Sequence, residues 1–217
     1  MPAVRISSVS DRVRIIAENR NDITVDGDAR IQVDGDRTTV DHVKSRLTVR
    51  VPLGTDVVIG TTSGRVEVAG AVGAASVVTE SGRIEIEEAA SLDARTTSAR
   101  VQVGRVSGRC RVRNKSGRVE VGACGGADVA TKSGRIDLQH VTGPVEAHCV
   151  SGRIEIRLDT SANVDAETVS GRISVHLPDA ARPHRVEGPM VFGDPPDGCD
   201  CTVRAASVSG RVEVTPS

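Results

Sequence analysis

Residues 116–121 read Ser-Gly-Arg-Val-Glu-Val, and near copies of this stretch recur along most of the 217-residue chain. Seven copies keep Ser-Gly-Arg, and one has Ala99 in place of the glycine. The first seven copies follow one another at intervals of 17 to 19 residues. The motif serines are Ser63, Ser81, Ser98, Ser116, Ser133, Ser151, Ser170 and Ser209. A fixed period of this size indicates stacked structural repeats.

Apolar and polar residues alternate on both sides of each motif serine. After Ser116, Val119 and Val121 flank Glu120, and the residues six and four places before the serine are also apolar. Alternation with period two over β-branched residues is typical of a strand with one buried face. The apolar positions change parity at the serine, so we expect a tight bend there. We interpret the following glycine as a small residue that faces inward at this bend.

The repeat length decides the fold class. A unit of about 18 residues with two strands cannot bury its apolar face alone, but stacked copies can. We therefore predict an all-β fold: a single-domain parallel β-solenoid (β-helix) of ~18-residue rungs, about 4.8 Å apart. Phe192 is the single aromatic residue, so the core must be thin and built from Val, Ile, Leu and Ala.

The first 50 residues are less regular and predict an antiparallel β-meander that caps the solenoid of residues 51–217. Asp26-Gly27-Asp28 and Asp34-Gly35-Asp36 separate short alternating runs, and Asp-Gly between such runs is a strong hairpin signal. The alternative is a set of degenerate rungs, because four arginines are also 16 to 19 residues apart. They are Arg12, Arg30, Arg46 and Arg65.

Residues 178–200 interrupt the array. Five of the nine prolines fall in this segment, and proline is excluded from central strands. We therefore predict a loop ejected from the stack, in which Met190 and Phe192 provide a candidate apolar contact with the solenoid or with a partner.

The tandem Ser-Gly-Arg-(Ile/Val)-Glu-Val units resemble the bacterial putative-adhesin family of β-strand-repeat proteins, a domain of unknown function. The resemblance covers roughly residues 50–217 and rests on eight copies of the motif. It implies a β-solenoid with an adhesive or scaffolding role, and it supplies no catalytic residues.

Charge and composition exclude several classes of protein. Lys and Arg number 28 and Asp and Glu 29, for a formal charge of −1, which argues against an electrostatic nucleic-acid binder. No apolar run approaches the ~18 residues of a membrane span. The N-terminus has no apolar signal-peptide core, so we expect a cytoplasmic protein, or a cell-surface protein only if an export signal was removed.

One arginine per repeat forms the most conspicuous polar ladder. It could bind an anion or a polysaccharide, or it could neutralise the acidic ladder two residues further on, and the near-zero net charge favours neutralisation. The candidate interaction face consists of Arg65, Arg83, Arg100, Arg118, Arg135, Arg153, Arg172 and Arg211.

No motif indicates catalysis, a cofactor or a metal. The motif serines have no His and Asp at a recurring offset, and the five irregularly spaced cysteines contain no Cys-x2-Cys pair for zinc.

We predict a non-enzymatic, adhesin-like scaffold that binds a protein or surface partner. The alternatives are a carbohydrate-active β-helix enzyme and a ligand-binding regulator that uses the 178–200 loop. The parallel edge at the C-terminal end predicts self-association or partner capture there, and the alternative is that the 178–200 segment folds across this end.

Overall fold

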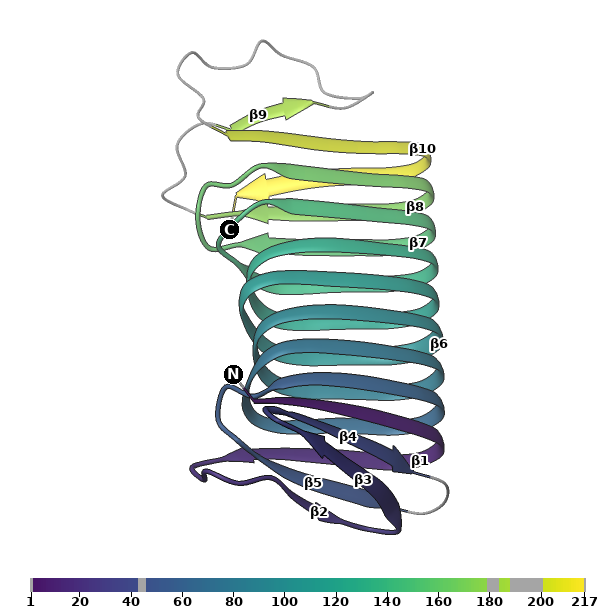
Figure 1. Ribbon diagram of the computed structural model, residues 1–217. Helices are drawn as coiled ribbons and strands as arrows, with labels where there is room; N and C mark the ends of the chain where they lie inside the picture. Colours follow the sequence, from purple (N-terminus) through teal and green to yellow (C-terminus); the bar gives the residue numbers. More distant parts are fainter. Residues whose placement is uncertain (1, 43–45, 179–183, 188–200, 217) are drawn as a thin grey trace.

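The computed structural model describes residues 2–42, 46–178, 184–187 and 201–216, and these residues form strands and no helix (Figure 1). The all-β class is therefore confirmed for this part of the chain, which also contains no helix long and apolar enough to cross a membrane. The strands are β1 (Ala3–Glu18), β2 (Thr24–Asp26), β3 (Ala29–Asp34), β4 (Arg37–His42), β5 (Leu47–Pro52), β6 (Asp56–Val141), β7 (Val145–Leu158), β8 (Val164–Leu177), β9 (His184–Glu187) and β10 (Cys201–Pro216).

The chain winds in successive turns that pair in parallel, with β6 alone running through several of them (Figure 1). Strand β7 pairs with β6 and β8, and β10 pairs with β8. The register places each motif serine on the preceding one, so that Ser133, Ser151, Ser170 and Ser209 stack in line. The described array therefore winds like a solenoid. Two antiparallel pairs near the N-terminus make the sheet as a whole mixed.

The interior of the turns is a single apolar core. Val129, Ile136 and Leu138, at the predicted inward positions of one turn, are each at most 1% exposed. At the bend, the residue two places before the motif serine is buried in most turns, and in several turns it is a threonine whose hydroxyl donates to the serine carbonyl. The Oγ–O distances are 3.1 Å for Thr61, 3.0 Å for Thr79 and 3.4 Å for Thr131. These bonds close the corner of the turn.

The conformation and orientation of the motif glycine differ from those predicted from the sequence. Gly134 has a φ of 143°, and a Cβ built on it would lie 1.8 Å from the carbonyl oxygen of Gly117 in the turn below. The glycine is half-buried at the corner and does not face the core. The predicted requirement for a small residue is confirmed, because a side chain would meet the neighbouring backbone. The predicted inward-facing orientation is wrong, and the position also requires a positive φ.

The prediction of an antiparallel meander in the first 50 residues is correct for one part of this segment and wrong for another. Strands β3 and β4 form the expected antiparallel hairpin around Gly35, whose φ is 57°. Strand β1 instead pairs in parallel with β6, with Arg12 beside Arg65, because its alternating residues fit the register of the motif. Strand β2 pairs with β5, so Asp26-Gly27-Asp28 does not join a hairpin. The division into residues 1–50 and 51–217 as domains stays a prediction.

The C-terminal end of the array is partly covered. Strand β9, which lies within the 178–200 segment, pairs in parallel with residues 201–204 of β10. The prediction that the whole segment is ejected is therefore wrong for residues 184–187, which contain no proline and can donate a backbone hydrogen bond at every position. Met190 and Phe192 lie outside the described residues.

A candidate binding groove along the corner of the turns

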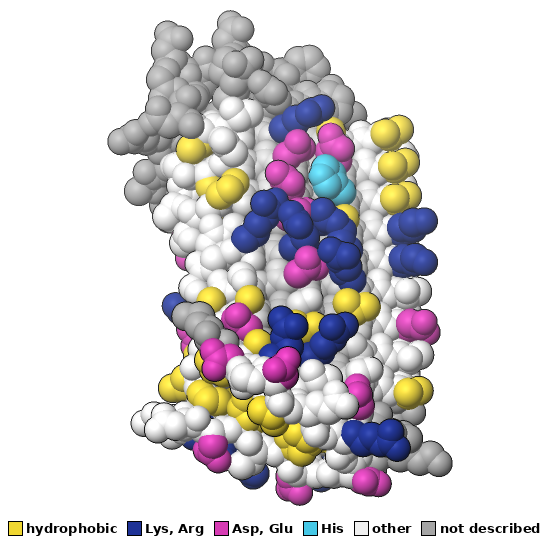
Figure 2. All heavy atoms as spheres, viewed as in Figure 1, with side chains coloured by type: hydrophobic (Ala, Val, Ile, Leu, Met, Phe, Trp, Pro, Cys, Tyr) yellow, Lys and Arg dark blue, Asp and Glu magenta, His cyan; other side chains and the backbone are white. Residues whose placement is uncertain are grey.

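A groove of about 1510 Å³ runs along the corner of the described array. Nine turns line it, each with the three residues that precede its motif serine or, in β1, the equivalent position. In one turn these residues are Arg113, Asn114 and Lys115. Figure 2 shows the groove between the charged band on the front face and the column of side chains at the right edge. We call this feature the corner groove.

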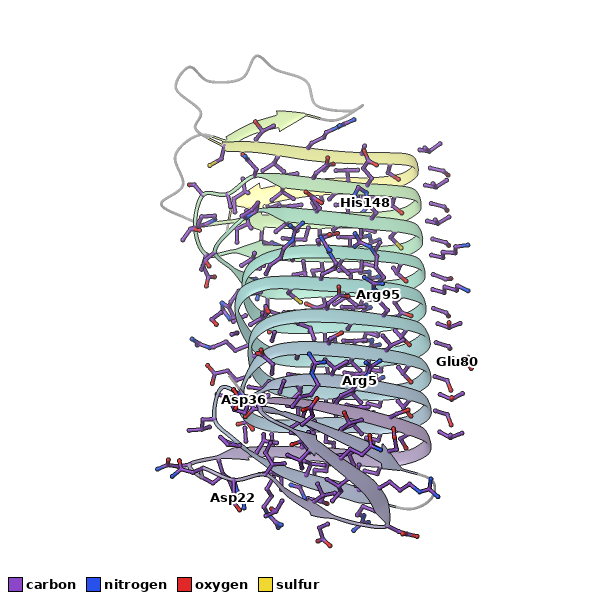
Figure 3. All side chains as sticks on the ribbon, in the orientation of Figure 1. Arg5, Asp22, Asp36, Glu80, Arg95 and His148 are labelled. Atoms are coloured by element: carbon purple, nitrogen blue, oxygen red, sulfur yellow. The ribbon has the colours of Figure 1, made fainter. Side chains whose placement is uncertain are left out.

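The alternation of the strand builds the corner groove. The first residue of each triplet points out from the face, as Arg95 and His148 do, and the third stands at the edge, as Glu80 does (Figure 3). The second residue is small, polar and buried in most turns, and it forms the floor. Thr96 and Thr168 are 8% and 4% exposed, and their hydroxyl oxygens have no hydrogen-bond partner among the described residues.

The middle of the corner groove is basic. Arg95 and Arg113 lie on its face side, and Lys115 and Lys132 stand exposed at its edge. Arg95 donates from Nε and Nη2 to the carboxylate of Asp93, over 3.3 and 3.4 Å. The two lysines have no ion pair among the described residues, so their charges face the solvent.

Three arginines converge on one buried carboxylate beside this basic segment. Asp128, with a side chain 5% exposed, accepts from Nη1 and Nη2 of Arg113 at 2.5 and 2.9 Å. Arg111 Nε and Arg109 Nη2 lie 3.1 and 3.5 Å from the same carboxylate. The hydrogen bonds from Arg113 hold the pKa of Asp128 below its usual value and raise the pKa of Arg113. One carboxylate thus holds three cations, whose side chains remain 40 to 61% exposed.

The C-terminal part of the corner groove is apolar at its edge and carries one glutamate, Glu167, on its face. Val150 and Val169 are each 50% exposed and Val208 is 84% exposed. On the face, His148 Nδ1 lies 3.5 Å from Glu167, and Arg204 lies 3.8 Å from the same glutamate. Figure 2 shows a run of hydrophobic side chains next to a run of basic ones in the edge column.

The predicted arginine ladder lies on the strand after the corner, away from the groove. Arg65 pairs with Glu67 of its own turn at 3.3 Å and with Glu85 of the next turn at 3.1 Å. Arg83–Glu85 and Arg118–Glu120 repeat the pairing within a turn. The other predicted arginines make no ion pair among the described residues. A role of this ladder in binding stays a prediction.

Three of the described cysteines, Cys110, Cys124 and Cys149, lack the character of reactive thiols. Burial raises the pKa of Cys110 to about 12 and that of Cys124 to about 11. Burial also raises the pKa of Cys149 on the groove floor. Thiols need a lowered pKa to act as nucleophiles or metal ligands at neutral pH. No group of three or more His, Cys, Asp or Glu that could hold a metal occurs in the described part of the chain.

Sequence reasoning concentrated on the motif and missed the corner groove. The signal lay one residue before the serine, where Lys115 and Lys132 are followed in later turns by Val150, Val169 and Val208. These residues are unrelated to the repeated motif, and stacking in register brings them into one column.

Comparison with known proteins gives a family and little more. The family model described as Toastrack DUF4097 matches residues 4–213. No curated protein matches. A crystal structure described as "a putative cell adhesion protein" from Clostridium sporogenes aligns over 100% of this chain and 92% of its own, at 6% identity and a TM-score of 0.23. A likeness of this strength carries no argument about this chain.

Proposed function

The chain belongs to the Toastrack DUF4097 family, and we propose that it is a non-enzymatic β-solenoid scaffold that binds a partner protein in the corner groove. The observation that carries the proposal is the groove itself, a continuous channel that crosses nine turns and is bordered by exposed valines and unpaired lysines. Exposed apolar side chains next to unpaired charges are typical of interaction surfaces. The proposal includes the cytoplasmic location expected from the sequence.

The carboxylates of the groove support binding over catalysis. The groove lining contains two glutamates, Glu80 and Glu167, which lie five turns apart. At about 4.8 Å per turn their separation is about 24 Å. Glycoside hydrolases place their two catalytic carboxyl groups about 5 to 9.5 Å apart. A carbohydrate-active enzyme is therefore the weaker alternative, and a regulator that uses the 178–200 loop depends largely on residues outside those described.

A groove-filling substitution tests the proposal. Ala130→Trp places a large side chain at a wall position that arginine and histidine occupy in other turns, so the fold should tolerate it. Gln102→Trp, at an exposed position on the strand after the corner, is the matched control. Cross-linked capture from the source organism should recover a set of proteins with the wild type and the control, and at least about tenfold less with Ala130→Trp. Equal recovery with all three proteins would contradict groove binding.

Self-association through the C-terminal end is a second candidate, favoured by one observation. Val212 and Val214 of β10 are only partly buried, whereas the equivalent Ile173 and Val175 of β8 are fully buried. Light scattering of the purified protein over a range of concentrations tests this candidate. A monomer at every concentration would overturn it and leave groove binding untouched.

A further inference from the structure

The basic segment of the corner groove carries more positive charge than its own carboxylates neutralise. Six cations gather on three adjacent turns, while Asp93, Asp128 and Glu146 are the carboxylates that act on Arg113. Of the hydrogen-bonding groups on Arg111, only Nε is bonded to Asp128, so both Nη groups remain available to an external anion. Four of these cations line the groove, namely Arg95, Arg113, Lys115 and Lys132, and Arg109 and Arg111 lie beside it around Asp128.

The basic segment is short. The groove lining changes from Glu80 to Arg95 on one side and from Lys132 to His148 and Glu167 on the other. From Arg95 to Lys132 the groove crosses two turn spacings, or about 10 Å. An extended peptide advances about 3.3 Å per residue, so the segment matches about three acidic residues. A longer polyanion would extend past the cations onto the flanking glutamates.

An apolar stretch of the groove edge follows the basic segment in the same column of side chains. Val150, Val169 and Val208 occupy three turns next to Lys132 and span another 10 Å or so. This length matches about three further residues of an extended chain. The column is the most exposed run of apolar side chains on the corner, and apolar side chains of a partner would remove it from water.

The floor requires hydrogen-bonding groups from its occupant. The hydroxyl oxygens of Thr96, Thr168 and Ser207 are buried without a partner among the described residues. Rotation about χ1 would turn them toward the groove, where a peptide offers one N–H and one C=O per residue. Nucleic acid fits less well, because the groove lining contains no aromatic side chain on which bases could stack.

Resting on the proposed function, we propose that the corner groove binds an extended peptide segment of a partner protein in which about three acidic residues adjoin about three apolar residues. The acidic half lies against Arg95, Arg113, Lys115 and Lys132. The apolar half lies along Val150, Val169 and Val208. The two halves recognise order as well as composition, because cations and valines occupy separate turns.

Fluorescence anisotropy with labelled synthetic peptides tests the proposal directly. Two probes carry three glutamates and three leucines as separate blocks, in the two possible orders, and a third alternates the same residues. We expect one block order to bind the full chain at least about tenfold more tightly than the alternating peptide. Replacement of the glutamates by lysines should abolish binding. Oligodeoxythymidylate and heparin serve as polyanions without apolar side chains and should bind more weakly than the block peptide.

Two variants with equal charge change locate the site. Lys115→Glu with Lys132→Glu should weaken the block peptide at least about tenfold, and folding should be retained because Glu80 occupies the same position in another turn. Arg105→Glu with Arg157→Glu, at two exposed positions outside both the groove lining and the arginine ladder, should leave the affinity unchanged. Val150→Thr with Val169→Thr should reduce the preference for the block peptide over the alternating one.

The possible outcomes separate this inference from the proposed function. Equal binding of block and alternating peptides, tighter binding of the polyanions, or loss of binding only in the Arg105/Arg157 variant would each overturn the acidic–apolar occupant. Absence of peptide binding at millimolar concentration would overturn it as well. The capture experiment with Ala130→Trp would still decide independently whether the groove binds a protein at all.

Discussion

The two strands of each turn differ in how strictly they repeat. On the strand after the corner, the second residue beyond the motif serine is arginine in all eight copies, and the fourth is acidic in six. On the strand before the corner, the outward position three residues upstream changes from turn to turn. It is Val78, Arg95, Arg113, Ala130 or His148 in successive turns.

The difference follows from what each strand must do. Stacked arginines and glutamates pair within and between turns in part of the array, as Arg65 does with Glu67 and Glu85, so the repeat contributes to the stability of the stack where such pairs form. A binding site needs unlike residues at defined places, and only positions free of the repeat can provide them. The unrepeated strand therefore contributes the corner groove, and the repeated strand contributes the support behind it.

The largest expected effect comes from breaking the repeated corner itself. In Gly134→Val the new Cβ would lie 1.8 Å from the Gly117 carbonyl oxygen at a φ of 143°. We expect a loss of about 3 kcal/mol or more in the free energy of unfolding, from backbone strain and overpacking together. Urea denaturation measures this loss. Gly54→Ala has a φ of 74° but open space around its Cβ and should cost only about 1 kcal/mol. Equal costs would show that crowding at the corner contributes little.

The next largest effect on stability is expected on the strand before the corner, whose residues do not repeat. Asp128→Asn removes the carboxylate that holds Arg109, Arg111 and Arg113, and we expect a loss of about 1–2 kcal/mol at pH 7. The folded-state pKa of Asp128 is lowered, so its contribution exists above the unfolded pKa of about 3.9. It is lost as the pH falls through the folded value. The difference between wild type and variant should therefore vanish at low pH, and a constant difference would contradict the ionic origin.

Sequence periodicity predicted the parallel turns because each core position has an unambiguous apolar identity. Val129, Ile136 and Leu138 are buried as expected. The conformation of the motif glycine was not predictable in the same way, because Ala99 in one copy favoured small size over a positive φ. The pairing of β1 corresponds to the alternative of degenerate rungs, and it was only partly visible because Asp11 replaces the motif glycine while Ser10 and Arg12 keep the positions of Ser63 and Arg65.

The candidate site was far less predictable than the fold. The corner groove depends on residues such as Lys132 and Val150, which are 18 positions apart in sequence and adjacent only because the turns stack in register. The convergence of Arg109, Arg111 and Arg113 on Asp128 likewise requires side chains from neighbouring turns to meet across the face. No local pattern identifies such a meeting in advance.

A smaller effect on stability is expected from removing two arginines of the repeated charge ladder. Arg118→Gln with Arg135→Gln leaves Glu120 and Asp137 without their nearby cations, and exposed pairs of this kind contribute about 0–1 kcal/mol each. Thermal denaturation should show a modest loss, and adding Glu120→Gln and Asp137→Asn should recover part of it. Unchanged stability combined with lost capture of the partner would instead assign a binding role to the arginine ladder.

The smallest expected effect is on stability, and it comes from replacing Asp137, which lies in the same turn as Asp128. Burial, followed by repulsion from Glu155 and Glu120, raises the pKa of Asp137, whereas the pKa of Asp128 is lowered. An acid with a raised folded pKa carries no penalty below its unfolded pKa of about 3.9, and the penalty grows as the pH rises through the folded value. Asp137→Asn should therefore slightly stabilise the protein at pH 7 and leave it unchanged near pH 3. Thermal denaturation at the two pH values measures both differences. Destabilisation at pH 7 would mean that attraction to Arg135 outweighs burial, and the acidic ladder would then stabilise the fold even where no ion pair forms.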